Sequence, residues 1–257
     1  MKFQIIKETP DYLIINKPAN LIVHGGPGIK EETLTDFLLA KYPQLKDVGE
    51  DPIRPAIVHR LDKEAGGLMI IPKTNLSFNY FKEQFKKRKI KKEYIALVSG
   101  TLDTDEGIID FPIKRSSQGY KMAAIPKKIK GLENEDCLEN ENISNRVKGN
   151  IKALENSRQA ITKFQVIKKM INYTLVKVNI STGRTHQIRV HFSALGHPLL
   201  GDNLYGNKKS KLQNKKMNMT RIFLMATDLS FINPQGEKEN ISINLSSDLE
   251  EILKKVK

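Results

Sequence analysis

The sequence predicts a single α+β domain with a mixed, mostly antiparallel central sheet and flanking helices. Short β-rich segments recur along the chain, and only a few stretches show the three-to-four-residue apolar spacing of a helix. This proportion of strands to helices is typical of an α+β fold. A length of 257 residues suits one large domain, and we assign residues 1–257 to it.

The N-terminal third contains three predicted strands and two predicted helices. Pro10 and Pro18 separate the strands, which we place at Phe3–Ile6, Tyr12–Ile15 and Leu21–Val23. Thr33 and Asp36 form a Thr-x-x-Asp capping box, so the first helix should begin at Thr33. Leu76–Arg88 should form the second helix, with its phenylalanines on one core-facing stripe.

The rest of the chain is richer in strands. We predict strands at Tyr94–Val98, Ile108–Ile113, Met122–Ile125, Ala160–Ile167, Tyr173–Ile180, Arg221–Ala226, Asp228–Phe231 and Glu239–Leu245, and a last helix over Asp248–Lys255 after a Ser246 or Ser247 cap. The spacing of Ile188, Phe192 and Leu195 predicts a short helix that stops at Gly196. Lys127–Ser157 is polar and without a sustained period, which indicates a flexible insertion.

Net charge favours a polyanionic partner, either nucleic acid or an anionic membrane surface. The formal charge is +14, and basic residues cluster in Lys82–Lys92 and Lys208–Lys216. Compositional drift and ordinary solvated helix faces are the alternatives. One cysteine excludes an internal disulfide and a cysteine-based zinc site. No apolar run reaches membrane-spanning length and no signal peptide begins the chain, so we expect a cytoplasmic protein without membrane attachment.

The most informative stretch is residues 57–67, Ile-Val-His-Arg-Leu-Asp-Lys-Glu-Ala-Gly-Gly. It places Asp62 between a predicted apolar strand and a predicted Gly66-Gly67 turn, with a second apolar run behind it. An acid on a tight loop between core strands is held rigidly, as a reacting carboxylate must be. The alternative is that Asp62 merely caps the turn.

Three further segments bear on this choice. Asn16-Lys17-Pro18 follows an early strand, Lys92-Glu-Tyr94 begins a later one, and the third is Gly183–His191 with Leu195–Asp202 and Tyr205-Gly206 after it. With His59-Arg-Leu-Asp62, this order resembles the RluA-type pseudouridine synthases from about Tyr12 to Phe231.

The resemblance implies the pseudouridine synthase catalytic fold and the isomerisation of uridine in structured RNA. Large-subunit ribosomal RNA is the first expected target and transfer RNA the second. An isomerisation needs no metal, cofactor or redox agent. Relatives often carry an N-terminal S4-type domain, for which we expect no room here. We expect a monomer without an obligatory protein partner.

The resemblance also assigns catalytic residues. Asp62 matches the catalytic aspartate, which acts as nucleophile or stabilises charge. Arg189 matches the basic residue that pairs with it, and its planar fork could orient a carboxylate by two hydrogen bonds. A surface RNA contact is the alternative for Arg189. Tyr94 matches the tyrosine that stacks on the target base and could take the C5 proton. Its alternative is a half-buried strand aromatic.

Other motif residues are assigned to RNA binding and support. Ile188 would form an apolar floor under the base, and Arg60 would contact the RNA backbone or fill the space of the flipped nucleotide. Arg184 and Lys17 would neutralise phosphates or brace the loop. His59 is expected to be a structural hydrogen-bonding residue.

Further residues beside the site are given structural roles. Asp202 and Tyr205 should hold a turn. His186, His191 and His197 lie on different sides of the predicted helix without a set of carboxylates, so we reject a metal site.

The sequence departs from the family at one point. Glu64-Ala65-Gly66-Gly67 stands where Asp-Thr-Ser-Gly or a similar sequence is common, so hydroxyls that could stiffen the loop are missing. Two other functions stay open: an inactive RNA-binding module on the same scaffold, and a hydrolase or nuclease that uses His59 and Asp62.

Overall fold

A computed structural model describes residues 2–116, 119, 121–125 and 156–256. Its strands are β1 Gln4–Glu8, β2 Tyr12–Lys17, β3 Gly66–Pro72, β4 Lys91–Ser99, β5 Glu106–Ile109, β6 Ile113–Arg115, β7 Met122–Ala124, β8 Thr162–Lys169, β9 Tyr173–Ile180, β10 Leu224–Ile232 and β11 Lys238–Ser242. The helices are α1 Leu34–Lys41, the 3-10 helix η1 Pro43–Asp47, α2 Asn75–Lys86, α4 Gln187–Ala194, α5 Lys208–Lys216 and α6 Ser247–Lys255. The predicted insertion Lys127–Ser157 lies almost entirely outside the described residues.

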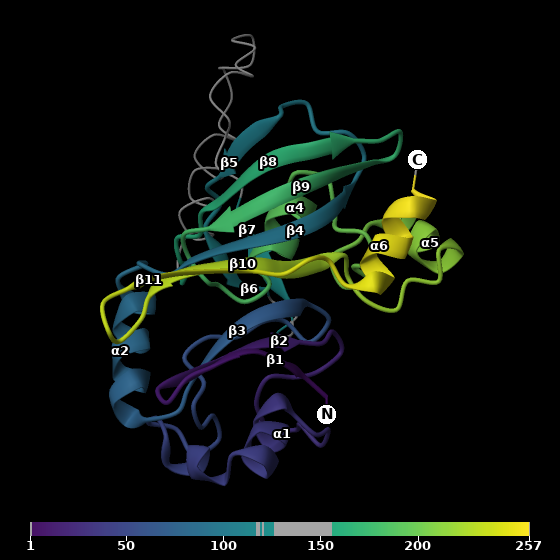
Figure 1. Cartoon of the computed structure of the whole chain (residues 1–257). Helices are drawn as coiled ribbons and strands as arrows, with labels where there is room; N and C mark the ends of the chain where they lie inside the picture. Colours follow the sequence, from purple (N-terminus) through teal and green to yellow (C-terminus); the bar gives the residue numbers. More distant parts are fainter. Residues whose placement is uncertain (1, 117–118, 120, 126–155, 257) are drawn as a thin grey trace.

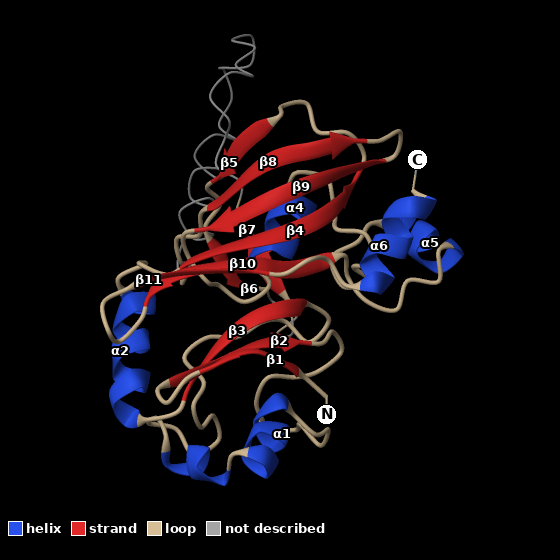
Figure 2. Cartoon of the chain, in the orientation of Figure 1, coloured by secondary structure: helices blue, strands red, loops and turns tan. Residues whose placement is uncertain are grey.

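One large sheet organises the described part of the chain (Figures 1 and 2). Its strands follow the order β1-β2-β3-β10-β4-β9-β8-β5, with β11 paired to β10, while β6 and β7 pair in a second small sheet. The β3–β10 pair is parallel, and the other pairs within the large sheet are antiparallel. The mixed, mostly antiparallel sheet predicted from the sequence is therefore confirmed.

The parallel junction of β3 with β10 depends on a glycine. Gly67 has φ +119°, and a Cβ there would lie 2.2 Å from the Ala226 carbonyl oxygen. Only glycine permits this backbone angle and this approach together. The predicted Gly66-Gly67 turn is therefore wrong, because both residues pair with β10 at the start of β3. The apolar strand predicted before Asp62 is also wrong, since residues 57–65 form a loop.

A second predicted strand, Leu21–Val23, is likewise a loop. Its carbonyl groups serve the start of a helix: Ile22 accepts from the Leu34 amide at 2.8 Å and Val23 from the Thr35 amide at 3.0 Å. These acceptors satisfy amides that a helix N-terminus leaves without intrahelical partners. The apolar pattern marked burial correctly, but the hydrogen bonds go to α1 and not to the sheet.

The predicted helix ends agree well with the structure. Asp36 accepts the Thr33 amide at 2.8 Å, as the capping box requires. Gly196 follows α4 with φ +86°, the left-handed conformation expected of a glycine helix stop. Helix α2 buries Phe78 and Phe81, whereas Phe85 is only partly buried. Helix α6 begins after Ser246.

Two strand boundaries differ from the predictions. The single segment Ile108–Ile113 divides into the end of β5 and the start of β6, which belong to different sheets. Conversely, Arg221–Ala226 and Asp228–Phe231 join in one strand, β10, with a register shift between Ala226 and Asp228. A shift of this kind adds twist without ending the strand.

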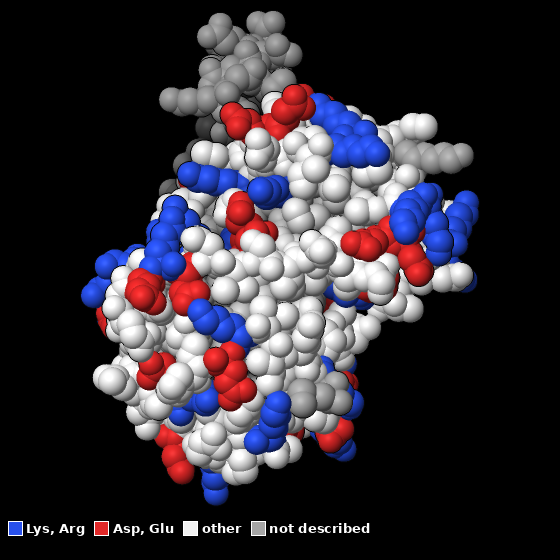
Figure 3. Space-filling model, viewed as in Figure 1, with Lys and Arg blue, Asp and Glu red and all other residues white. Residues whose placement is uncertain are grey.

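The helices lie around the sheet, α2 at one side in Figure 1 and α5 with α6 at the other. Figure 3 shows basic side chains near both of these sides, with acidic side chains interspersed. Within the described ranges, no helix is both long and apolar enough to cross a bilayer.

Candidate active site

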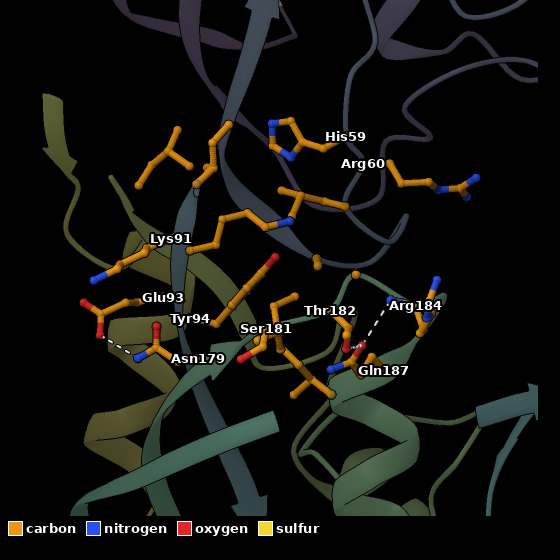
Figure 4. Close-up of a pocket in the computed structure, with 18 of the residues that line it drawn as sticks. His59, Arg60, Lys91, Glu93, Tyr94, Asn179, Ser181, Thr182, Arg184 and Gln187 are labelled. Carbon is orange, nitrogen blue, oxygen red and sulfur yellow. Dashed lines mark hydrogen bonds between the residues drawn. The ribbon is translucent and has the colours of Figure 1, made fainter. Parts of the chain in front are cut away.

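A cavity of about 1130 Å³ lies where the loop 57–65 faces strands β4 and β9. Its lining includes every residue from Ile57 to Asp62, then Tyr94 from β4, and the segment 180–188 that leads into α4 (Figure 4). Ligand pockets commonly enclose several hundred to about 1000 Å³, so this space is large enough for a nucleotide. Segments far apart in the sequence thus meet at one hollow.

Three contacts of its neighbours fix the loop that carries Asp62. The Leu61 side chain is 5% exposed and packs in the core. The Ile70 amide of β3 donates to His59 Nε2 at 2.9 Å, and Lys17 Nζ donates to the Lys63 carbonyl at 3.3 Å. Asp62 itself keeps 19% side-chain exposure and lines the cavity. The loop is therefore anchored on both sides of its carboxylate.

Arg189 reaches Asp62 from the first turn of α4. Its Nη1 lies 3.5 Å from Asp62 Oδ2 and 3.2 Å from Glu64 Oε2. Its other two nitrogens donate to Asp202, Nε to Oδ2 at 2.7 Å and Nη2 to Oδ1 at 3.1 Å. The expected pairing of Arg189 with Asp62 is present, but the two-bond fork holds Asp202. Asp62 receives only the remaining nitrogen, which it shares with Glu64.

Asp202 connects the guanidinium to a turn. Its side chain is fully buried, and Oδ1 also accepts the Leu204 and Tyr205 amides, both at 2.9 Å. The predicted turn role is thus present, together with an unpredicted hold on Arg189. Burial acts to lower the pKa of Arg189, but Asp202, Asp62 and Glu64 outweigh it and raise that pKa above its ordinary value. The guanidinium is permanently charged.

Tyr94 and Ile188 form an apolar part of the wall. Their residues are both 4% exposed, and both line the cavity. Figure 4 shows the Tyr94 side chain directed toward the centre of the cavity. Burial raises the pKa of the Tyr94 hydroxyl, and the charge of Asp62 raises it further. The phenol is therefore protonated at neutral pH.

Lys17 is buried and contacts backbone carbonyls of the loop region. The residue is 0% exposed, and its Nζ donates to the carbonyls of Pro18 and Leu21, both at 2.8 Å, besides that of Lys63. Burial and the charge of Arg221 lower the pKa of Lys17 to about 7. Of its two predicted roles, the loop-bracing one fits this geometry.

Arg60 and Arg184 come from two different segments that line the cavity, and Figure 4 shows both on the same side of it. Arg60 is exposed, with Nη1 3.2 Å from His24 Nε2. Arg184 is half-buried and donates from Nε to the Gln159 carbonyl at 3.2 Å. Figure 4 shows both side chains extending outward, where an RNA backbone could reach them.

The three histidines of the predicted helix region have separate partners. His186 Nδ1 lies 2.8 Å from the Tyr205 hydroxyl, His191 Nδ1 2.9 Å from Thr162 Oγ1, and His197 Nδ1 2.8 Å from the Ser99 carbonyl. Within the described ranges, no group of three or more His, Cys, Asp or Glu side chains is placed to hold a metal ion.

Several lining or contacting residues were not predicted as parts of the site. Glu64 shares Arg189 Nη1 with Asp62, and Phe85 and Lys92 line the cavity. Lys92 had a sequence signal, because side chains two apart on a strand face the same side and Tyr94 was already assigned. Phe85, by contrast, has no such sequence signal, because its spacing places it on the same apolar helix stripe as the buried Phe78 and Phe81.

Comparisons with known proteins place these observations in a family. Residues 11–194 match the family model described as RNA pseudouridylate synthase. An uncharacterized RNA pseudouridine synthase of Aquifex aeolicus is 37% identical over 91% of this chain and 66% of its own length. Ribosomal large subunit pseudouridine synthase D of Buchnera aphidicola is 33% identical over 96% of this chain and 71% of its own. The chain spans about two thirds of the length of the curated relatives it matches.

Solved structures show the same fold at lower identity. Human RNA pseudouridylate synthase domain containing 4 superposes with a TM-score of 0.69 at 23% identity, covering 99% of this chain and 94% of that one. Human RNA pseudouridylate synthase domain containing 1 gives a TM-score of 0.68 at 23% identity, covering 95% and 83%.

Proposed function

Because the chain belongs to the RNA pseudouridylate synthase family, we propose that it is an enzyme that converts uridine in RNA to pseudouridine. The contact that carries this proposal joins Arg189 Nη1 to Asp62 Oδ2 in a cavity lined by Tyr94 and Ile188. A carboxylate beside a guanidinium, next to an apolar wall that can hold a base, suits this isomerisation.

The reaction breaks the bond between the ribose C1′ and uracil N1 and forms one between C1′ and C5. Asp62 assists departure of the uracil, either as nucleophile or by stabilising positive charge on the sugar. The uracil then turns within the cavity and rejoins through C5. The C5 proton leaves and N1 gains a proton, so that substrate and product have the same composition.

Tyr94 and Ile188 would hold the detached base. The Tyr94 ring offers a stacking surface, and Ile188 offers an apolar floor. Because the phenol is protonated, Tyr94 can accept the C5 proton only if its own proton passes to another acceptor. Asp62, whose charge acts on Tyr94, is our candidate for that acceptor.

Entry of the uridine would require base flipping. A uridine inside a helix cannot reach a cavity this deep without leaving its stack. Arg60, exposed at the rim, would fill the space that the nucleotide leaves or contact the backbone there. Arg184, which also lines the cavity, would contact a phosphate of the same RNA.

Large-subunit ribosomal RNA is our first candidate target. The relatives include proteins named ribosomal large subunit pseudouridine synthase C and D. Transfer RNA is the second candidate. We infer that the protein acts as a monomer in the cytoplasm, where both RNAs are found.

The test is to incubate the purified protein with transcribed ribosomal and transfer RNA and to map pseudouridine at nucleotide resolution. We expect conversion of one or a few uridines without strand cleavage. Tight binding without conversion would instead support an inactive RNA-binding module. Strand cleavage would support the hydrolase alternative that uses His59 and Asp62.

A further inference from the structure

Lys92 lines the cavity but has no part in the reaction proposed for Asp62 and Tyr94. Lys92 lies on β4 two residues before Tyr94, so the two side chains project from the same face of the strand, about 7 Å apart along it. Both line the cavity. In Figure 4 the intervening Glu93 and the preceding Lys91 point away from the Tyr94 side. Lys92 is half-buried, with Nζ 5.5 Å from the centre of the Phe85 ring.

Lys92 Nζ has no hydrogen-bond acceptor or carboxylate partner among the residues that the structure describes. The carboxylates of the same wall have other partners: Glu93 accepts from Asn179 at 2.9 Å, and Asp228 from Ser242 at 2.6 Å. A desolvated cation without an anion is costly for a protein to keep. Burial accordingly lowers the pKa of Lys92 to about 8.

The neighbouring histidine cannot serve as the missing partner. His59 stacks on Phe85 with ring centres 4.6 Å apart, and the charge of Lys92 acts on it. Its Nε2 accepts the Ile70 amide, so the proton of the neutral ring is on Nδ1. That Nδ1 is buried and has no partner among the described residues. This part of the wall therefore contains donors that lack an acceptor.

We propose that Lys92 binds an RNA phosphate next to the flipped uridine, within the cavity and not at its rim. The proposal rests on the proposed function, because the phosphate belongs to the RNA that delivers the uridine. A phosphate would supply the anionic partner that Lys92 lacks. Because Lys92 lies one strand repeat from Tyr94, its contact would couple binding of the RNA backbone to binding of the base. A cation–π contact with the face of the Phe85 ring positions the ammonium.

The test compares wild type with Lys92→Met, which keeps the length of the side chain and removes its charge. Lys254→Met on α6 is the matched control, because Lys254 is exposed outside the cavity and its loss lowers net charge equally. The probe is a fluorescein-labelled RNA fragment with a uridine that wild-type protein converts. Its dissociation constant is measured by fluorescence anisotropy from 50 to 200 mM salt, with thermal unfolding of each free protein.

Because Lys92→Met cannot bind a phosphate, its slope of log affinity against log salt should be smaller than that of wild type by ~0.7 to 0.9. The wild-type affinity should then fall about threefold more than that of the variant across the salt range. Lys254→Met should keep the wild-type slope. The melting temperature of free Lys92→Met should not fall, because loss of the Phe85 contact is offset by removal of a half-buried charge that has no anionic partner before RNA binds.

Two results would overturn the role of Lys92. An unchanged salt slope in Lys92→Met would exclude a phosphate contact, and a slower turnover with unchanged slope and affinity would assign the lysine to the chemistry. Failure of wild-type protein to convert any fragment would refute the proposed function instead, so the two failures are distinguishable.

Discussion

Asp202→Asn tests how Arg189 is held. Asp202 is fully buried and donates no proton, whereas asparagine would place an amide NH₂ or a single carbonyl against the two N–H groups of the guanidinium. Removing one partner of a buried ion pair costs about 3 to 5 kcal/mol. Because asparagine keeps one acceptor for the Leu204 and Tyr205 amides, we expect the low end, about 3 kcal/mol.

The assay is urea unfolding followed by circular dichroism, with turnover and RNA affinity measured on the same preparations. Asp105→Asn is the control, since Asp105 is 83% exposed and meets Lys169, itself 39% exposed, at 2.8 Å. Exposed ion pairs contribute about 1 kcal/mol or less, so the control should change stability little. Turnover of Asp202→Asn should fall with RNA affinity retained, because Arg189 loses its orientation toward Asp62.

A double variant separates the effect of charge from that of packing. Arg189→Met with Asp202→Asn removes both charges, keeps an acceptor for the Leu204 and Tyr205 amides, and should recover much of the stability that Asp202→Asn alone loses, while remaining inactive. Loss of less than about 1 kcal/mol in Asp202→Asn would show that Asp202 does not secure Arg189.

Three further predictions concern other positions. Tyr94→Phe should bind RNA normally but turn over more slowly if the hydroxyl takes the C5 proton; equal single-turnover rates would remove that role. Gly67→Ala should lower the free energy of unfolding by about 3 kcal/mol or more, because its Cβ would meet the Ala226 backbone, whereas Gly183→Ala, with no atom within 4 Å of the new Cβ, should stay near wild type in urea unfolding. Lys17 has a pKa of about 7 folded against 10.5 unfolded, so between these values the unfolded chain binds more protons and stability rises with pH. The free energy of unfolding of wild type relative to Lys17→Met should therefore increase by about 3 kcal/mol from pH 7 to 9.5, and a flat difference would contradict the low pKa.

Local signals in the sequence predicted many of the elements correctly. The capping box at Thr33, the helix stop at Gly196 and the alternation in β9 each involve residues a few positions apart, and each matches the structure. Apolar runs identified burial but not hydrogen bonding. Leu21 and Val23 are buried without pairing in the sheet, because the carbonyls of Leu21–Val23 serve α1 and Lys17.

Long-range geometry could not be predicted in the same way. The glycine pair at the start of β3 predicts a turn from sequence alone, because only the approach of Ala226, from a strand far along the chain, shows why a side chain is excluded. The motifs predicted correctly that Asp62 and Arg189 lie together. That Glu64 and Asp202 also bind the guanidinium depends on side-chain conformations, which the motifs do not specify. Strand alternation could have placed Lys92 beside Tyr94, but not its lack of a partner.

The most direct measurement is single-turnover pseudouridine formation by Asp62→Asn on an RNA that wild-type protein modifies. Asparagine keeps the size of the side chain but cannot act as a carboxylate. We predict that the rate falls by roughly 10³-fold or more while RNA affinity stays close to wild type. A rate near that of wild type would contradict the role of Asp62, since no other group in the cavity was assigned to the sugar.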